Sequence, residues 1–366
     1  MPRRDRSPAA VDRLPGPRRG AIAALPVALA LFFAGLSVGG CERHGAPAGT
    51  PEQATAPVGR TTDGPASAPS AAGPASGPAV APAGRLPEKL ADCRFASLSP
   101  ALTQVLVDLG LGGQIVGRTP FCDSVPETVT VVGSLLDVDY ERLLQSAPTH
   151  VVVQPAAAGT DPELERLATE HRWVLIERGL DRLGDVEAFL RDLVPQLALP
   201  ASAETTALAE RCDAAARSLA ALHGPLGAAA PAAGTRTVVL VATEPLTAVG
   251  ADTFVSEMLA AAGASNAITA GGYPELSYED LATIDPETIV VLLDAEPGPG
   301  EREAILRRLL GSPTKAAASR RVAIHVDPES MLPSTRAPAA VTRLRACLSG
   351  LDAAGAVDGT KAGGAR

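Results

Sequence analysis

The stretch PASAETTALAERCDAAARSLAALHGP, residues 200–225, decides the fold because it predicts one long helix between two strand-rich regions. Ser202 can cap the start of this helix, and Gly224 followed by Pro225 ends it. One face carries apolar side chains at spacings of three and four residues: Leu208, Cys212, Ala215, Leu219 and Leu222. A helix of about 22 residues is roughly 33 Å long. Such a helix can bridge two small domains.

A sequence pattern recurs on the two sides of this helix. Residues 140–153 contain YERL, a proline and the apolar run VVV, and residues 278–291 contain YEDL, a proline and the run IVV at the same spacing. Each copy predicts a short helix with an acid in its first turn, followed by a buried strand. Two copies around a long helix predict two similar lobes.

Charge and composition exclude some classes of partner. The chain has 366 residues and a net charge of −9. Residues 1–41 hold six arginines and two aspartates, so the remainder has 26 basic and 39 acidic residues, a net charge of −13. Such a surface repels nucleic acid, and an aromatic content of 3% leaves few rings for base stacking. We expect no nucleic-acid partner and no cofactor.

The cysteines and histidines give no metal-binding pattern. The five cysteines form no CxxC pair and the five histidines are isolated from one another, which disfavours structural zinc and iron–sulfur clusters. Cys212 and Cys347 lie in predicted helices and could form a disulfide in an oxidising compartment.

The first part of the sequence resembles a lipoprotein signal. An arginine-rich segment precedes an apolar run of 16 residues, 21–36, and LSVGGC then ends at Cys41. This resembles the lipobox of bacterial lipoproteins, which implies cleavage before Cys41 and acylation of that residue; an ordinary signal peptide or an uncleaved anchor is the alternative. Residues 42–90 are rich in Ala, Pro, Gly and Ser and are predicted to form a disordered tether, with a reach of about 35–40 Å.

The two flanking regions, 91–199 and 235–351, alternate predicted strands and helices. This alternation predicts parallel sheets whose ligand crevice lies at the carboxyl ends of the strands. Arg118 and Arg336 could meet a ligand carboxylate or phosphate, or could be solvated. Trp173, in the strand-like segment WVLIE, is expected in the core. Residues 352–366 are expected to form a flexible tail.

Residues 94–350 resemble a known family. The segments ASLSPALTQVLVDLGLGGQIVGRTPFCD (96–123), VVGSLLDVDYERLLQSAPTHVVVQ (131–154) and LATEHRWVLIERGLDRLGDVEAFLRDL (167–193) are similar to the first lobe of periplasmic substrate-binding proteins for cobalamin, haem and ferric siderophores, which serve ABC importers. The resemblance implies two Rossmann-like α/β lobes joined by one backbone helix, with the ligand between the lobes. The cobalamin branch looks most similar.

The resemblance also implies roles for individual residues. Glu141 and Glu279, at matching positions of the repeat, correspond to the acids that dock into arginine pockets of the permease; the alternative is that both only stabilise their helices. A large flat ligand needs apolar and aromatic walls with a few polar groups. The candidate ligand-binding residues are Ser99, Phe121, Leu136, Gln154, Glu244, Tyr273 and Met331.

The resemblance therefore implies a monomeric, extracytoplasmic binding lipoprotein for a corrinoid, haem or ferric siderophore, and not an enzyme. One alternative is a zinc or manganese receptor, which would need several His and carboxylate ligands, although only His325 falls on a predicted rim. Another is an enzyme acting on a corrinoid or nucleotide, although the sequence has no glycine-rich phosphate loop or GxSxG motif. The third is a surface lipoprotein that no longer serves a transporter.

Overall fold

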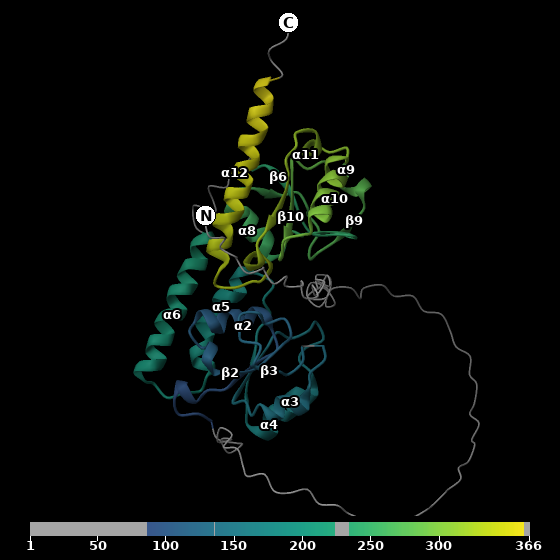
Figure 1. The fold of residues 1–366 in the computed structure, drawn as a ribbon. Coiled ribbons are helices and arrows are strands. Elements are labelled where there is room, and N and C mark those ends of the chain that lie inside the picture. The colour runs from purple at the N-terminus through teal and green to yellow at the C-terminus, as the bar shows by residue number, and fades with distance from the viewer. Residues whose placement is uncertain (1–85, 135, 224–233, 362–366) are drawn as a thin grey trace, which may run out of the picture.

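The computed structural model describes residues 86–134, 136–223 and 234–361, with side chains described up to residue 351. Cys41, the predicted signal peptide and residues 42–85 of the predicted tether lie outside the described residues. The described chain forms two α/β lobes, which confirms the predicted fold class (Figure 1). Leu90, within the last part of the predicted tether, is buried in the main core. The domain boundaries drawn from the sequence stay predictions.

The first lobe contains a five-stranded parallel sheet in the order β3-β2-β1-β4-β5. Its strands are β1 (Phe95–Ser97), β2 (Ile115–Arg118), β3 (Thr130–Val131), β4 (His150–Val153) and β5 (Val174–Glu177). Its helices are η1 (Leu90–Asp92), α2 (Pro100–Asp108), η2 (Gly112–Gln114), α3 (Tyr140–Gln145), α4 (Pro162–His171) and α5 (Leu183–Gln196). Strands and helices alternate as the sequence predicted, except that β3 follows β2 without a helix between them.

The second lobe has a mixed sheet. Its strands are β6 (Arg236–Thr243), β7 (Leu246–Ala248), β8 (Ser265–Asn266), β9 (Glu275–Leu276), β10 (Thr288–Leu293) and β11 (Val322–Val326), in the order β11-β10-β6-β7-β9 with β8 also paired to β6. Its helices are α8 (Phe254–Ala262), α9 (Tyr278–Ile284), α10 (Pro299–Leu310), α11 (Lys315–Ala318), η4 (Pro328–Met331) and α12 (Ala337–Lys361).

Strand β7 departs from the parallel sheet predicted for this lobe. It pairs antiparallel with both β6 and β9. Glu244 and Pro245, joined by a cis peptide bond, separate β6 from β7. A two-residue connection can only join antiparallel strands, so the expected outgoing loop is a hairpin turn. The sheet remains rich in parallel pairs because β10 pairs in parallel with both β6 and β11.

The repeated sequence pattern forms equivalent elements in the two lobes. Helix α3 is capped by Asp139, whose Oδ1 accepts a hydrogen bond from the Arg142 amide at 3.0 Å, and α9 is capped by Ser277, whose Oγ accepts from the Asp280 amide at 3.0 Å. Each helix leads into a buried strand, β4 or β10, that pairs in parallel with the first strand of its lobe, β1 or β6.

The long helix α6 (Ala203–Ala220) connects the lobes and continues into a 3-10 turn, η3 (Ala221–His223). Ser202 is its N-cap, since the Ser202 Oγ accepts a hydrogen bond from the Thr205 amide at 3.2 Å. Its apolar face packs into the main core, where Leu208, Cys212 and Leu219 are buried and Ala215 and Leu222 are partly buried. Cys212 and Cys347 are both free thiols, and burial raises the pKa of Cys212 to about 11.

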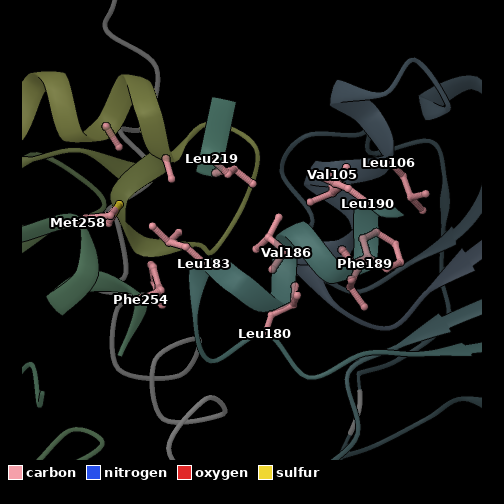
Figure 2. Packing of buried hydrophobic residues seen from close by; sticks show 14 of the residues in the cluster. Val105, Leu106, Leu180, Leu183, Val186, Phe189, Leu190, Leu219, Phe254 and Met258 are labelled. Carbon is pink, nitrogen blue, oxygen red and sulfur yellow. The ribbon is translucent and has the colours of Figure 1, made fainter. Parts of the chain in front are cut away.

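Helix α5 also bridges the lobes, which the sequence analysis did not predict. At its start, Leu183 lies near Phe254 and Met258 of the second lobe, and farther along Phe189 and Leu190 lie near helix α2 of the first lobe (Figure 2). All these side chains belong to one continuous buried cluster. Burial of each large apolar side chain contributes about 1.5–3 kcal/mol, so separating the lobes would expose a costly surface.

Candidate functional site

The loops that leave the carboxyl ends of β2 and β10, one in each lobe, both carry an acidic residue. Asp123 follows β2 in the first lobe, and Asp294 follows β10 in the second. Burial raises the pKa of Asp294, and the negative charge of Asp123 raises it further. Asp123 and Asp294 are therefore near enough for their charges to interact.

Ser99 and Gln154 lie together at this end of the first sheet. The Ser99 Oγ donates a hydrogen bond to the Gln154 Oε1 at 3.2 Å and accepts one from the Leu102 amide at 3.3 Å. Ser99 is buried and caps α2, whereas Gln154 is half-buried. Ser99 therefore mainly holds the rim in place, and Gln154 is the polar group of this pair that is open to a ligand.

The loop after β2 is anchored by a buried thiol. The hydroxyls of Thr103 and Thr119 each lie 3.1 Å from the Cys122 Sγ, and the Phe121 amide donates to the Thr119 Oγ1 at 3.2 Å. Phe121 is half-buried between these anchored neighbours. Leu136, in the loop after β3, is 53% exposed. Both positions offer apolar surface at the rim.

The candidate residues of the second lobe do not form one group. Tyr273 and Met331 are partly buried and pack against the core cluster that crosses the junction. Burial raises the pKa of Tyr273, as do the nearby charges of Asp181 and Asp252, so its hydroxyl stays protonated and can donate a hydrogen bond. Glu244 is instead exposed in the hairpin turn and forms an ion pair with Arg308 of α10.

Several polar residues of the junction were missed by the sequence analysis. The Arg182 Nε lies 2.7 Å from the Glu257 Oε1, and the Leu183 amide donates to the Glu257 Oε2 at 2.8 Å. The Phe254 amide donates to the Asp181 carbonyl oxygen at 2.9 Å. Each contact joins the start of α5 to α8. No sequence motif indicates these pairs, since their members are more than 70 residues apart.

Arg118, Arg336 and Trp173 have different environments. Arg118 is 8% exposed, and its buried Nε has no hydrogen-bond partner within the described part of the chain. Arg336 forms ion pairs with Asp108 and Glu329, so it is a structural link. Trp173 is half-buried, stacks on His171 with ring centroids 5.2 Å apart, and packs against a satellite of the core.

Glu141 and Glu279 occupy the same position in α3 and α9. Each is the second residue of its helix, each is exposed, and each has an exposed apolar neighbour, Leu144 or Tyr278. The Glu141 Oε1 accepts a hydrogen bond from the Gln145 amide group at 3.1 Å. Figure 1 shows the two helices on the right of the view, one in each lobe.

Two further features concern metals and membranes. No cluster of three or more His, Cys, Asp and Glu side chains suited to a metal ion occurs among the residues that the structure describes. Within the same residues, no helix has both the length and the apolar character needed to span a bilayer. The apolar run 21–36 lies outside the described ranges.

Comparison with known families decides the classification. The family model described as "Periplasmic binding protein" matches residues 95–328, more than half of the chain. The chain belongs to the periplasmic binding protein family. It is therefore an extracytoplasmic solute-binding protein of an ABC transport system, and not an enzyme. A search of curated proteins gave no match.

Solved structures share the fold. The periplasmic haem-binding protein RhuT from Roseiflexus sp. RS-1, in its apo form, is 22% identical with a TM-score of 0.54, covering 72% of this chain and 99% of its own. The periplasmic vitamin B12-binding protein BtuF of Vibrio cholerae is 17% identical with a TM-score of 0.54, covering 71% and 97%. The periplasmic haem-binding protein HutB of Vibrio cholerae is 19% identical with a TM-score of 0.56, covering 70% and 98%.

Proposed function

We propose that this protein is a monomeric lipoprotein that captures a corrinoid of the cobalamin type, or a haem or ferric-siderophore chelate, and delivers it to the permease of an ABC importer. The observation that carries the proposal is the family match over residues 95–328, together with a fold shared with haem-binding and vitamin B12-binding proteins. Acylation of Cys41 would hold the protein at a bacterial membrane, and residues 42–85 would let the lobes move above it.

The proposed ligand site lies between the lobes. Phe121 and Leu136 of the first lobe and Tyr273 and Met331 of the second would supply apolar and aromatic walls, while Gln154 would supply a polar contact. Ser99 would act by holding Gln154, through the hydrogen bond of 3.2 Å. Glu244 belongs to the same proposed set, although its ion pair with Arg308 must open before it can meet a ligand.

The proposed permease contacts are Glu141 and Glu279. Both carboxylates are exposed in the first turn of equivalent helices, which leaves them free to enter arginine pockets of two membrane subunits. A bidentate carboxylate–guanidinium pair fixes orientation as well as adding affinity.

The test is an absorption spectrum of residues 85–366 after mixing with cobalamin, cobinamide, haemin or a ferric siderophore and desalting. These ligands are coloured, so a retained ligand is seen directly. We expect one of them to be retained in stoichiometric amount and to be recovered unchanged. Retention of none of the four would overturn the proposed ligand class.

A further inference from the structure

A groove lies along the outer edge of strand β5 in the first lobe. It has a volume of about 790 Å³, and its lining includes Leu86, Ala168, Trp173, Val174 and Leu175. β5 is the last strand of its sheet, and no strand among the described residues pairs with its other side. Figure 1 shows α4, which also borders the groove, at the end of the first lobe farthest from the second lobe. The groove is therefore separate from the proposed ligand site.

The groove follows the edge of the sheet and not one of its faces. Val174 packs against the main core, whereas Trp173 and Leu175 pack against the smaller cluster around Leu143 and Val151. The three lining side chains are half-buried. Because successive side chains of a strand point to opposite faces, a groove that all three line runs along the outer edge of the strand.

The backbone of β5 offers unused hydrogen-bonding groups along this edge. The Val174 amide donates to the Thr149 carbonyl oxygen at 2.9 Å, in register with the parallel pairing of β5 and β4. Since alternate residues of a strand direct their backbone groups to opposite sides, the amides of Leu175 and Glu177 point away from β4. Neither amide has a hydrogen-bond partner within the described part of the chain. A free edge of this kind is a template for another extended segment.

The chain itself enters the fold through this groove. Leu86 lines the groove and is 42% exposed, and the next residue, Pro87, is buried. The residues before Leu86 therefore start at the groove. Among residues 59–85, Val80 is the only branched apolar residue. The six residues from Val80 to Leu86 span up to about 20 Å, whereas the four residues of β5 span about 13 Å, so Val80 can reach any part of the groove.

The prolines of the preceding segment are compatible with pairing along one edge. Residues 78–85 read PAVAPAGR, with prolines at positions 78 and 82. Residues four apart in an extended segment direct their backbone nitrogens to the same side, so both missing amides fall on one edge. The opposite edge keeps its amides and can pair with β5.

Charge also favours this segment as the occupant. Two acidic side chains that line the groove, Glu165 and Glu177, are exposed and form no ion pair within the described ranges. The groove has one basic lining residue, Arg172, so acids outnumber bases. Arg85 is the only charged residue among residues 64–85, and its positive charge is complementary to this excess.

We propose that residues 78–85 dock in this groove as an extended segment and cover the free edge of β5. Because the segment is joined to Leu86, docking is intramolecular and needs only modest contacts. The segment then belongs to the first lobe, and residues 42–77 remain as the tether. A covered edge also keeps β5 from pairing with a second copy of the chain, which is the competing occupant.

The test uses the full chain, purified in detergent, and two matched substitutions. Val80→Asp places a carboxylate in an apolar groove that already has an excess of acids, which opposes docking. Val58→Asp is the control, since it makes the same change in charge outside the proposed segment. Neither position lies in a lobe, so both variants should unfold at the wild-type temperature. No ligand is needed, so the result does not depend on the proposed function.

Two measurements report on the groove directly. Trp173 is the only tryptophan of the chain, so acrylamide quenching of tryptophan fluorescence measures access to the groove. Hydrogen exchange by mass spectrometry over residues 173–178 covers the outward amides of Leu175 and Glu177. In Val80→Asp we expect the quenching constant to rise about twofold and these two amides to exchange about tenfold faster. Val58→Asp should match the wild type in both measurements. A synthetic peptide of residues 78–85, added to Val80→Asp, should restore the protection.

Three results would overturn the inference. Equal quenching and exchange in the wild type and in both variants would show that the segment does not cover the groove. Equal loss of protection in both variants would show an effect of tether charge in general. Protection that weakens over about a hundredfold dilution of the wild type, and persists in Val80→Asp, would assign the groove to a second copy, because intramolecular docking does not depend on concentration.

Discussion

The Asp108 carboxylate of the first lobe is held by Arg336 of the second lobe, with the Arg336 Nη2 2.8 Å and its Nε 3.1 Å from the Asp108 Oδ1. Thr335 adds a hydroxyl hydrogen bond of 2.5 Å to the other carboxylate oxygen. Asp108 ends α2, and Arg336 directly precedes α12. The contact therefore joins the lobes at a second place, separate from the start of α5, and limits how they can move apart.

Disrupting this pair should weaken the lobe junction. We expect Arg336→Gln to lower the free energy of unfolding by about 1 kcal/mol, with a coupling to Asp108→Asn of the same order in a double-mutant cycle. The measurement is urea unfolding followed by circular dichroism. Arg166→Gln is the control, since Arg166 pairs with Glu163 and Glu170 of its own helix, α4, and its loss should have a smaller effect. Additive effects of the two junction substitutions would contradict the prediction.

The apolar part of the junction predicts a change in unfolding cooperativity. Leu183 is fully buried between α5 and the second lobe, so Leu183→Ala should cost about 2–5 kcal/mol and should also uncouple the lobes. We expect the calorimetric transition to split or broaden. Leu190→Ala, in the same helix but near α2, is the control and should destabilise to a similar degree with one sharp transition. If each of the two variants unfolded in one sharp transition, the lobes would remain coupled without Leu183.

The sequence predicted those elements whose signals are local. Strand β11 was predicted at its observed bounds because an apolar run is flanked by polar residues, and the start of α6 was predicted because Ser202 is a capping residue. The repeat predicted α3 with β4 and α9 with β10 because both copies carry the whole unit. These features depend on neighbouring residues alone.

The junction could not be predicted in the same way. Arg182 and Glu257 meet only because α5 crosses from one lobe to the other, and nothing in either local sequence indicates that meeting. Strand β7 was missed because Glu244 and Pro245 looked like an ordinary loop and the next three residues are too few for a strand pattern. The proposed pocket residues were assigned from their places at predicted strand ends and from the family resemblance, and the structure joins two of them, Ser99 and Gln154, by a direct hydrogen bond.

A buried histidine predicts acid sensitivity. His150 in β4 is fully buried, and burial lowers its pKa below the ordinary value of 6.5 although the Leu197 carbonyl partly opposes this. The unfolded chain therefore binds a proton at higher pH than the folded chain, so stability falls as the pH drops below about 6.5. We expect His150→Gln to flatten this dependence, by up to about 1.4 kcal/mol per pH unit, in urea unfolding between pH 5 and pH 7. Val151→Ala, a packing change in the same strand, should lower stability at every pH and keep the slope. An unchanged slope in His150→Gln would assign the acid sensitivity to other groups.

The two repeated glutamates should matter for transport and not for ligand binding. Glu141 and Glu279 are exposed in the first turns of α3 and α9 and are not among the proposed ligand-binding residues, so the double substitution to Ala should leave ligand affinity within about twofold. Uptake by cells that depend on this protein should fall to the level of a strain without it, because both proposed permease contacts lose their charge. The matched control replaces two other exposed first-turn acids, Glu165 of α4 and Glu301 of α10, with Ala. If the four glutamates acted only by stabilising the starts of their helices, the two double variants would show the same uptake. Normal uptake with Glu141 and Glu279 both replaced would refute the docking assignment.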